Sequence, residues 1–123
     1  SISGFPAWVL AKARSGEEIP VFSDQRVSPS YAKTTAKTLL DLLEADQRGT
    51  FNIASQSCVT PYEFGQLIVE EAGFTDATLT ESSMSDIDRD AARPQYTCLD
   101  TTAVEEALGR PQSTLEEDLA DLL

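Results

Sequence analysis

Histidine is absent from the 123-residue chain, and its absence removes several kinds of chemistry. Without an imidazole there can be no Ser-His or Cys-His nucleophile pair and no His ligand for zinc. The two cysteines, Cys58 and Cys98, do not have metal-ligand spacing, so we expect no metal site. The simplest interpretation is that both are small buried apolar side chains in a reducing compartment, with a disulfide as the less favoured alternative.

A glycine-rich loop is also missing. The six glycines are dispersed, and none forms the close phosphate-binding turn that a dinucleotide needs at the start of a helix. Short-chain reductases use a Tyr followed four residues later by a Lys, but Tyr31, Tyr62 and Tyr96 have no Lys at that offset. With 21 acidic residues some carboxylate pair always exists, so such a pair does not indicate hydrolysis. We therefore predict no catalytic and no cofactor-binding residue here, and no catalysis by this chain alone.

Basic residues are few, because nine Lys and Arg stand against 21 Asp and Glu, which gives a formal net charge of −12. Such a chain repels phosphate backbones and anionic surfaces, so neither nucleic acid nor a membrane is expected as a partner. The acids are scattered, as on a solvated surface, and adaptation to a high-salt cytoplasm is a sharper hypothesis for them.

Long apolar runs are missing as well, since no segment approaches the roughly 18 residues of a membrane span. The first residues, Ser1 to Gly4, lack the basic and apolar blocks of a secretion signal, so we predict a cytoplasmic protein. The chain does not begin with Met. It is therefore open whether it is a natural product or a processed, cloned or proteolysed piece.

What is present indicates one small α/β domain of about five helices with a few short strands, because 41% of the residues are apolar and 24% charged. Apolar periodicity and end signals predict helices over 5–15, 31–44 and 61–72. Two more are predicted near the end of the chain, one that carries Val104, Ala107 and Leu108 and a last one that carries Leu115, Leu119 and Leu122. Strands are predicted over 19–22, 50–54 and 77–81, with a polar loop over 23–30 and an acidic linker over 82–92. Pro20 cannot donate to a β-ladder, which places the first strand at a sheet edge.

Two helices carry the clearest local signals. Thr60, Pro61 and Glu63 combine a capping hydroxyl, a first-turn Pro and a Glu that can reach back, and Gly73 ends the helix. Ser30 is expected to cap the helix over 31–44, and Ser113 to Glu116 repeats the capping-box pattern before the last helix. The helix over 31–44 has one apolar face, which comprises Ala32, Ala36, Leu39, Leu40 and Leu43, and its charged residues lie away from that face.

Five polar residues are candidates for recognition: Asp24, Gln25, Ser28, Ser30 and Arg93. They combine hydrogen-bonding side chains with proline-stiffened backbone, which suits a polar sugar or a diphosphate. Ordinary loop and capping chemistry is the alternative, and Arg93 could instead pair with Asp90 or Asp100.

These residues also carry a resemblance. Four short motifs follow one another along the chain. They are an Asp-Gln pair followed by Pro and a hydroxyl residue that opens a helix (residues 24–32), a Gly-aromatic strand (49–54), a hydroxyl-capped helix with Glu-Phe (60–64), and Arg-Pro followed by Leu-Asp (93–101). In order and spacing they resemble the C-terminal region of dTDP-4-dehydrorhamnose reductases, which are extended short-chain dehydrogenases. Gly4 stands where members often have Asn, and Ser30 replaces Thr.

The resemblance implies that residues 1–123 are the C-terminal sugar-nucleotide-binding region, and that an absent N-terminal Rossmann part carries the glycines and the Tyr/Lys pair. It implies reduction of a 4-keto-6-deoxy sugar nucleotide by NADPH or NADH in dTDP-rhamnose biosynthesis, with a possible homodimer. Within the same scaffold, a sugar-nucleotide epimerase or a non-catalytic regulatory subunit are the alternatives. Since strand 50–54 would have lost its neighbours, we expect the isolated chain to pair with a partner or to aggregate.

Overall fold

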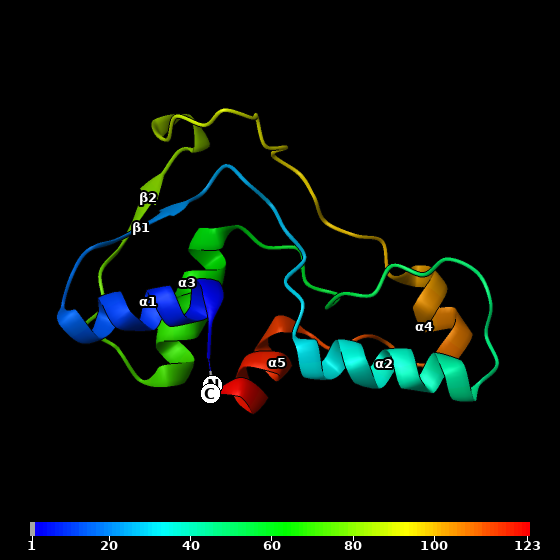
Figure 1. Ribbon diagram of the computed structural model, residues 1–123. Helices are drawn as coiled ribbons and strands as arrows, with labels where there is room; N and C mark the ends of the chain where they lie inside the picture. The colour runs from blue at the N-terminus through cyan, green and yellow to red at the C-terminus, as the bar shows by residue number, and fades with distance from the viewer. Residues whose placement is uncertain (1) are drawn as a thin grey trace.

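The computed structural model describes residues 2–123, while Ser1 lies outside the described residues. Within 2–123 it contains five α-helices, two β-strands and one 3-10 helix (Figure 1), so the predicted α/β class is confirmed. In chain order the elements are α1 (Gly4–Ser15), β1 (Ile19–Phe22), α2 (Ala32–Glu44), α3 (Pro61–Ala72), β2 (Leu79–Ser82), η1 (Met84–Asp86), α4 (Thr102–Leu108) and α5 (Leu115–Leu122). None of the described helices is long and apolar enough to cross a membrane.

The two strands form a small parallel sheet. Ile19 pairs with Leu79 at one end of the ladder, and Phe22 pairs with Ser82 at the other. With only two strands both are edges, which suits Pro20 because its nitrogen cannot donate a hydrogen bond. The carboxyl ends of β1 and β2 therefore lie side by side, and the polar loop and the acidic linker start from the same edge (Figure 1).

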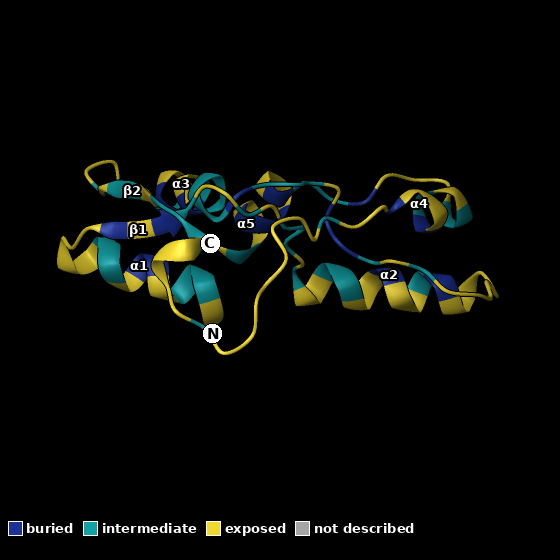
Figure 2. Ribbon diagram, turned by 90° about the horizontal axis from the view of Figure 1, so that it is seen from above, coloured by how far each residue is buried: buried dark blue, intermediate teal, exposed yellow. Residues whose placement is uncertain are grey.

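The main core joins α1, β1, α3 and α5, which gather on one side of the molecule in Figures 1 and 2. Each of these four elements contributes two buried side chains, which are Val9, Leu10, Ile19, Val21, Ile68, Val69, Leu115 and Leu119. Burying one such side chain stabilises the fold by about 1.5–3 kcal/mol. The core thus holds the sheet and its carboxyl edge in place.

The start and end of α3 follow the predicted signals. The Thr60 hydroxyl accepts a hydrogen bond from the Glu63 amide at 3.1 Å, and the Glu63 carboxylate accepts one from the Thr60 amide at 3.3 Å. Gly73 closes the helix in the left-handed region with φ of 82°, where Gly has no steric penalty. At α5 the capping box is real but joins Thr114 to Glu117, one residue later than predicted.

The helix predicted over 31–44 is formed as α2, but its apolar face is not buried and its predicted cap is wrong. All five residues of the predicted apolar face are exposed, and Leu39, Leu40 and Leu43 show 52%, 59% and 67% of their surface. The buried residues of α2 are Thr38 and Leu42, on the side toward α4. Because α4 is short, it covers only a narrow strip of α2. The N-cap is Tyr31 without a side-chain hydrogen bond, so Ser30 does not cap this helix.

The strand predicted over 50–54 is not formed. These residues run between α2 and α3 without a ladder partner in the described chain, although Phe51 and Ile53 are half-buried. A β-strand requires hydrogen bonds from a neighbour, and the two-stranded sheet lies elsewhere in the molecule. Segment 50–54 therefore has the alternation of apolar residues that is typical of a β-strand, but it has no neighbouring strand to pair with among the described residues.

The cysteine prediction was also wrong, because Cys58 and Cys98 form a disulfide across 40 positions of sequence. Neither cysteine belongs to the buried core; both are half-buried in loops. Segment 26–28 pairs with residues near each of them, through isolated bridges from Arg26 to Tyr96 and from Val27 to Val59. This shared neighbour brings the two sulfurs together, and sequence spacing alone does not reveal it.

Candidate functional site

A cavity of about 580 Å³ opens where β1 and β2 end, and we call it the aromatic cavity. Helix α1, both strands, the first residue of α3 and η1 with the residue after it contribute to its walls. The lining residues are Phe5, Trp8, Pro20, Val21, Phe22, Gln25, Pro61, Ser82, Asp86 and Ile87. Most are apolar, and the few polar groups lie among them, as is usual for small-molecule sites.

The aromatic rings of this cavity are held by their neighbours. Phe5 and Trp8 are one turn apart on α1, with ring centroids 5.9 Å apart, and Phe5 also packs on Phe64 of α3 at 4.9 Å. Trp8 nevertheless keeps 40% of its surface exposed. The Lys12 ammonium lies 5.9 Å from the centre of the Trp8 ring. A ring that is held in place and partly exposed next to a cavity can contact a planar ligand.

Residues 83–97, which we call the strap, contribute Asp86 and Ile87 to one border of the cavity. The first residues of the strap are fixed by Asp24, whose carboxylate accepts hydrogen bonds from the Ser83 hydroxyl at 2.7 Å and from the Met84 amide at 3.0 Å. The Ser83 hydrogen bond, followed by that of the Met84 amide, lowers the pKa of Asp24. Asp24 thus accepts these bonds as a carboxylate at neutral pH.

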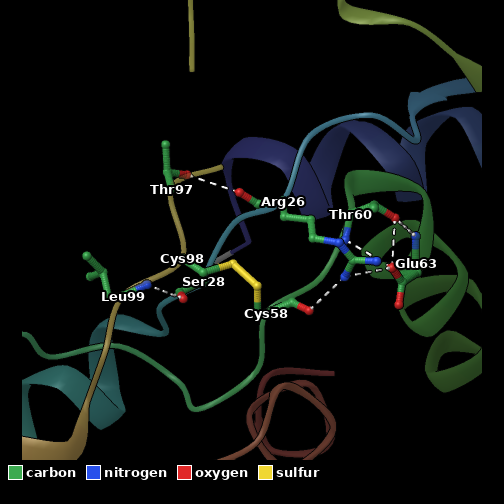
Figure 3. Close-up of a disulfide and its surroundings, with 8 residues drawn as sticks. All are labelled: Arg26, Ser28, Cys58, Thr60, Glu63, Thr97, Cys98 and Leu99. Atoms are coloured by element: carbon green, nitrogen blue, oxygen red, sulfur yellow. Dashed lines mark hydrogen bonds and ion pairs between the residues drawn. A yellow bond between two sulfur atoms is a disulfide. The ribbon is translucent and has the colours of Figure 1, made fainter. Parts of the chain in front are cut away.

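The other end of the strap is fixed to the same loop (Figure 3). The Arg26 amide donates to the Gln95 carbonyl at 2.7 Å, and the Thr97 amide donates to the Arg26 carbonyl at 2.9 Å. Next to it, Cys98 is bonded to Cys58, and the Leu99 amide donates to the Ser28 hydroxyl at 2.9 Å. Residues 24–28 therefore hold both ends of the strap.

The Arg26 side chain connects the C-terminal end of the strap to the start of α3. Its Nη1 donates to the Cys58 carbonyl at 3.4 Å and lies 3.7 Å from the Glu63 carboxylate, which also caps α3 (Figure 3). The loop of Arg26, the disulfide and the start of α3 are thus joined in one network.

A second hollow, the strap groove, lies along the strap and has a volume of about 550 Å³. It is lined by both arginines of the strap, Arg89 and Arg93, and by the two aspartates Asp88 and Asp90, and it shares Ile87 with the aromatic cavity. The Arg89 guanidinium lies 5.8 Å from the centre of the Phe22 ring, and its buried Nε has no hydrogen-bond partner. Within residues 2–123, neither arginine forms an ion pair.

The residues predicted from sequence fall into separate places. Gln25 lines the aromatic cavity and Arg93 lines the strap groove. Asp24 and Ser28 hold the two ends of the strap, and Ser30 lines a different groove, between the starts of α1 and α2 and the end of α5. The structure thus brings Gln25 and Arg93 to adjoining hollows and leaves Ser30 apart from them.

Sequence reasoning missed the aromatic walls and Arg89. Phe5 and Trp8 have helical spacing, which indicates a core-facing side as readily as a binding site, and Phe22 was part of a short apolar strand. The available signal was the combination of rings on an N-terminal helix with a ring at a strand end. Arg89 stands in an acidic linker, where its surroundings gave no indication of a site.

A dinucleotide cofactor does not fit the residues described here. β1 leads into the polar loop 23–30, which contains no Gly, so the strand-to-helix turn that cradles a diphosphate is lacking at this position. No step of hydride transfer is assigned to these side chains. What they offer is a cavity with aromatic walls next to a groove with two arginines.

Comparison with known proteins shows the family of the chain. Residues 2–123 match the family described as the RmlD substrate binding domain. The chain is 53% identical over 120 residues to the probable low-salt glycan biosynthesis reductase Agl14 of Haloferax volcanii, covering 97% of this chain and 40% of that protein. It is 32% identical over 110 residues to the spore coat polysaccharide biosynthesis protein SpsK of Bacillus subtilis, covering 89% and 38%.

A solved structure of dTDP-4-dehydrorhamnose reductase from Bacillus anthracis, in complex with NADP, superposes with a TM-score of 0.87 at 22% identity. The match covers 98% of this chain and 43% of that one, so the chain spans less than half of each relative. The likeness extends over nearly all of the described elements and includes the strands and the loops that frame both hollows. The chain belongs to the family of RmlD substrate binding domains.

Proposed function

We propose that residues 1–123 are the sugar-nucleotide-binding region of an NAD(P)H-dependent reductase that acts on a 4-keto-6-deoxy sugar nucleotide such as dTDP-4-dehydrorhamnose. The observation that carries this proposal is the aromatic cavity beside a groove with two arginines that lack ion pairs. A sugar nucleotide has the matching parts, because a planar base and an anionic diphosphate are linked in one molecule. The family and the reductases among the relatives support the reaction class.

In this proposal the base enters the aromatic cavity. Trp8 and Phe22 offer ring faces, and the Gln25 amide can both donate to and accept from the edge of a pyrimidine. Asp86 adds an acceptor on the strap side. Stacking on a fixed aromatic ring contributes about 1–3 kcal/mol per base.

The diphosphate would lie toward Arg89 and Arg93. These two guanidinium groups share one groove next to the cavity, together with the carboxylates of Asp88 and Asp90, so an anion would have to bind on the arginine side of the groove. The unpartnered Nε–H of Arg89 would donate a hydrogen bond to such a ligand once the side chain turns toward it. Asp24, Ser28 and Ser30 were also predicted to bind substrate; in this arrangement Asp24 and Ser28 act by holding the strap, and a direct contact of Ser30 remains a prediction.

In this proposal the cofactor and the sugar nucleotide are bound by different parts of the full-length protein. A bound NADPH or NADH supplies the hydride, and we propose that an N-terminal Rossmann part outside these residues holds it together with a Tyr/Lys pair. The residues described here would bind the sugar nucleotide, orient its keto carbon toward that part and exclude water from the base. A homodimer of the full-length protein remains a prediction.

The exposed apolar face of α2 supports the existence of a docked N-terminal part. Leu39, Leu40 and Leu43 form a continuous apolar patch, and the nearby segment 50–54 has strand pattern without a strand partner. A sheet edge from the rest of a longer protein could pair with 50–54 while its adjoining surface covers α2. Both features are what a fold leaves open when its neighbour is removed.

The scattered acids and the likeness to a reductase of Haloferax volcanii support a salt-adapted cytoplasmic enzyme as part of the same proposal. Dense surface carboxylates keep a protein hydrated when salt is concentrated, and salt also screens their mutual repulsion.

Binding can be tested with thymidine diphosphate, because Trp8 is the single Trp of the chain and lines the aromatic cavity. Thymidine diphosphate should change Trp8 fluorescence in a saturable way, whereas inorganic diphosphate should not. The double variant R89A/R93A should weaken binding about tenfold or more, since charge-assisted hydrogen bonds contribute about 1.5–3 kcal/mol each. Arg48, an arginine on the turn after α2, provides the matched control R48A.

The reaction class is tested with the full-length protein. NADPH oxidation that depends on dTDP-4-dehydrorhamnose supports the reductase, and interconversion of two sugar nucleotides without net oxidation of cofactor would favour an epimerase. Absence of both activities, with thymidine diphosphate still bound, would favour a regulatory subunit and overturn the proposed reaction.

A further inference from the structure

The strap is held at its ends and hardly at all along its length. None of residues 83–97 is buried, and Ile87 and Tyr96 expose 49% and 66% of their surface. Along its length, the Arg89 guanidinium lies 5.8 Å from the centre of the Phe22 ring of β1, and Asp86 and Ile87 line the aromatic cavity. The position of the strap over the aromatic cavity therefore depends on how its two ends are attached.

The attachment at the C-terminal end combines non-covalent contacts with one covalent bond. The backbone contacts run from the Arg26 amide to the Gln95 carbonyl at 2.7 Å and from the Thr97 amide to the Arg26 carbonyl at 2.9 Å. The side-chain hydrogen bonds there, such as that from the Leu99 amide to the Ser28 hydroxyl, are solvent-exposed and compete with water. The disulfide between Cys58 and Cys98 is different, because it ties the strap to the segment that leads into α3. α3 belongs to the main core, so the disulfide connects the strap to the most stable part of the fold.

We propose that the disulfide between Cys58 and Cys98 is a redox-sensitive clamp that keeps the strap closed over the aromatic cavity, so that its reduction lowers the affinity for the nucleotide. The part of this inference that concerns affinity rests on the proposed function. The part that concerns the strap does not, since it follows from the attachment of residues 83–97 alone. Disulfides of cytosolic proteins are commonly transient or redox-sensing, which agrees with such a role.

Both cysteines are half-buried in loops, so a small thiol can reach them. A thiolate of a dithiol reductant attacks one sulfur, the bond between Cys58 and Cys98 breaks, and a mixed disulfide forms. The second thiol of the reductant then closes its own disulfide. Cys58 and Cys98 end as two thiols, the reductant ends oxidised, and two electrons and two protons have been transferred.

The rate of trypsin cleavage after Arg89 measures how often the strap opens. Arg89 is the cleavable basic residue within 83–97, because Arg93 is followed by Pro94 and resists trypsin. Cleavage requires local opening, and Arg89 is half-buried over Phe22 in the closed strap. Arg48 has an 88% exposed side chain and serves as the internal control.

The oxidised chain, the chain treated with dithiothreitol and the variant C58S/C98S are digested under native conditions and analysed by mass spectrometry after full reduction. Reduction and the double variant should each raise the rate of cleavage after Arg89 about tenfold, as expected when a constraint on local opening is lost. Cleavage after Arg48 should stay unchanged. Dithiothreitol should have no further effect on C58S/C98S, which excludes an action of the reductant elsewhere.

Equal rates after Arg89 in the oxidised and reduced chains would overturn the clamp. Since C58S/C98S could fail to fold, the reduced wild-type chain is the primary sample, and its far-UV circular dichroism must match that of the oxidised chain. Affinity for thymidine diphosphate is measured on the same samples. A faster cleavage with unchanged affinity would overturn the link to the cavity, whereas an absence of binding in both states would refute the proposed function and leave the strap result standing.

Discussion

Replacing the exposed leucines of α2 tests whether this face is an interface of a longer protein. Leu40 and Leu43 expose 59% and 67% of their surface, whereas Leu42 on the same helix exposes 5%. Gln has a helix propensity close to that of Leu and leaves the net charge unchanged, so it isolates the loss of apolar burial. The variant L40Q/L43Q changes two residues on the exposed side of α2, and the control L42Q changes one residue on its buried side, so their losses are compared per site.

The burial of each side chain sets the expected magnitudes. A fully buried Leu contributes about 1.5–3 kcal/mol, so L40Q/L43Q should lower the free energy of unfolding of this chain by about 1 kcal/mol or less per site. L42Q loses nearly the whole contribution and buries an amide, and it should cost about 3 kcal/mol or more. Urea unfolding followed by circular dichroism measures both, and sedimentation velocity should show less self-association for L40Q/L43Q than for the wild type.

In the full-length protein the difference between the two faces should disappear. If an N-terminal part covers α2, Leu40 and Leu43 are buried there, and L40Q/L43Q should destabilise by several kcal/mol, as L42Q does. A full-length protein that tolerates L40Q/L43Q would refute the docking of that part on α2. Equal losses for L40Q/L43Q and L42Q in the 123-residue chain would refute the exposure on which the reasoning depends.

Three further outcomes are expected. F22A should weaken binding of thymidine diphosphate about tenfold in calorimetry, because one stacking face is lost, and unchanged affinity would exclude Phe22 from the base site. D24A should speed cleavage after Arg89, as reduction does. The hydrogen bond from the Ser83 hydroxyl lowers the pKa of Asp24, so the stabilisation from this anchor is complete above the ordinary aspartate pKa and is lost as the pH falls through the lowered value. NMR of the Met84 amide can follow that loss. The urea midpoint of the chain should rise in molar KCl, and a midpoint that does not rise would count against salt adaptation.

Helix α3 could be predicted from the sequence because its signals are local. Thr60, Pro61 and Glu63 act within one turn, and Gly73 requires only its own backbone freedom. The same holds for Gly16 after α1, which also lies in the left-handed region. Where a residue needs only its near neighbours, the pattern and the structure agree.

The predictions that were wrong concern residues whose contacts are far away in sequence or are not among the described residues. The apolar stripe of α2 correctly indicates a surface that avoids water, but it does not say which part of a protein covers it. Residues 50–54 have strand character without a partner strand among the described residues. The bond between Cys58 and Cys98 depends on the loop 26–28 that lies against both segments, which no spacing rule contains.

The loop 24–28 explains why the candidate site was only half predictable. Its Asp-Gln pair was identified as one recognition motif, yet the structure gives the two residues different tasks: Gln25 lines the aromatic cavity, while Asp24 holds the first residues of the strap. Arg26 and Ser28 hold the other end. A loop that fixes both ends of a segment cannot change without moving the wall of the cavity, so variants of Asp24 should alter binding through the strap; a direct contact of Asp24 with substrate remains a prediction.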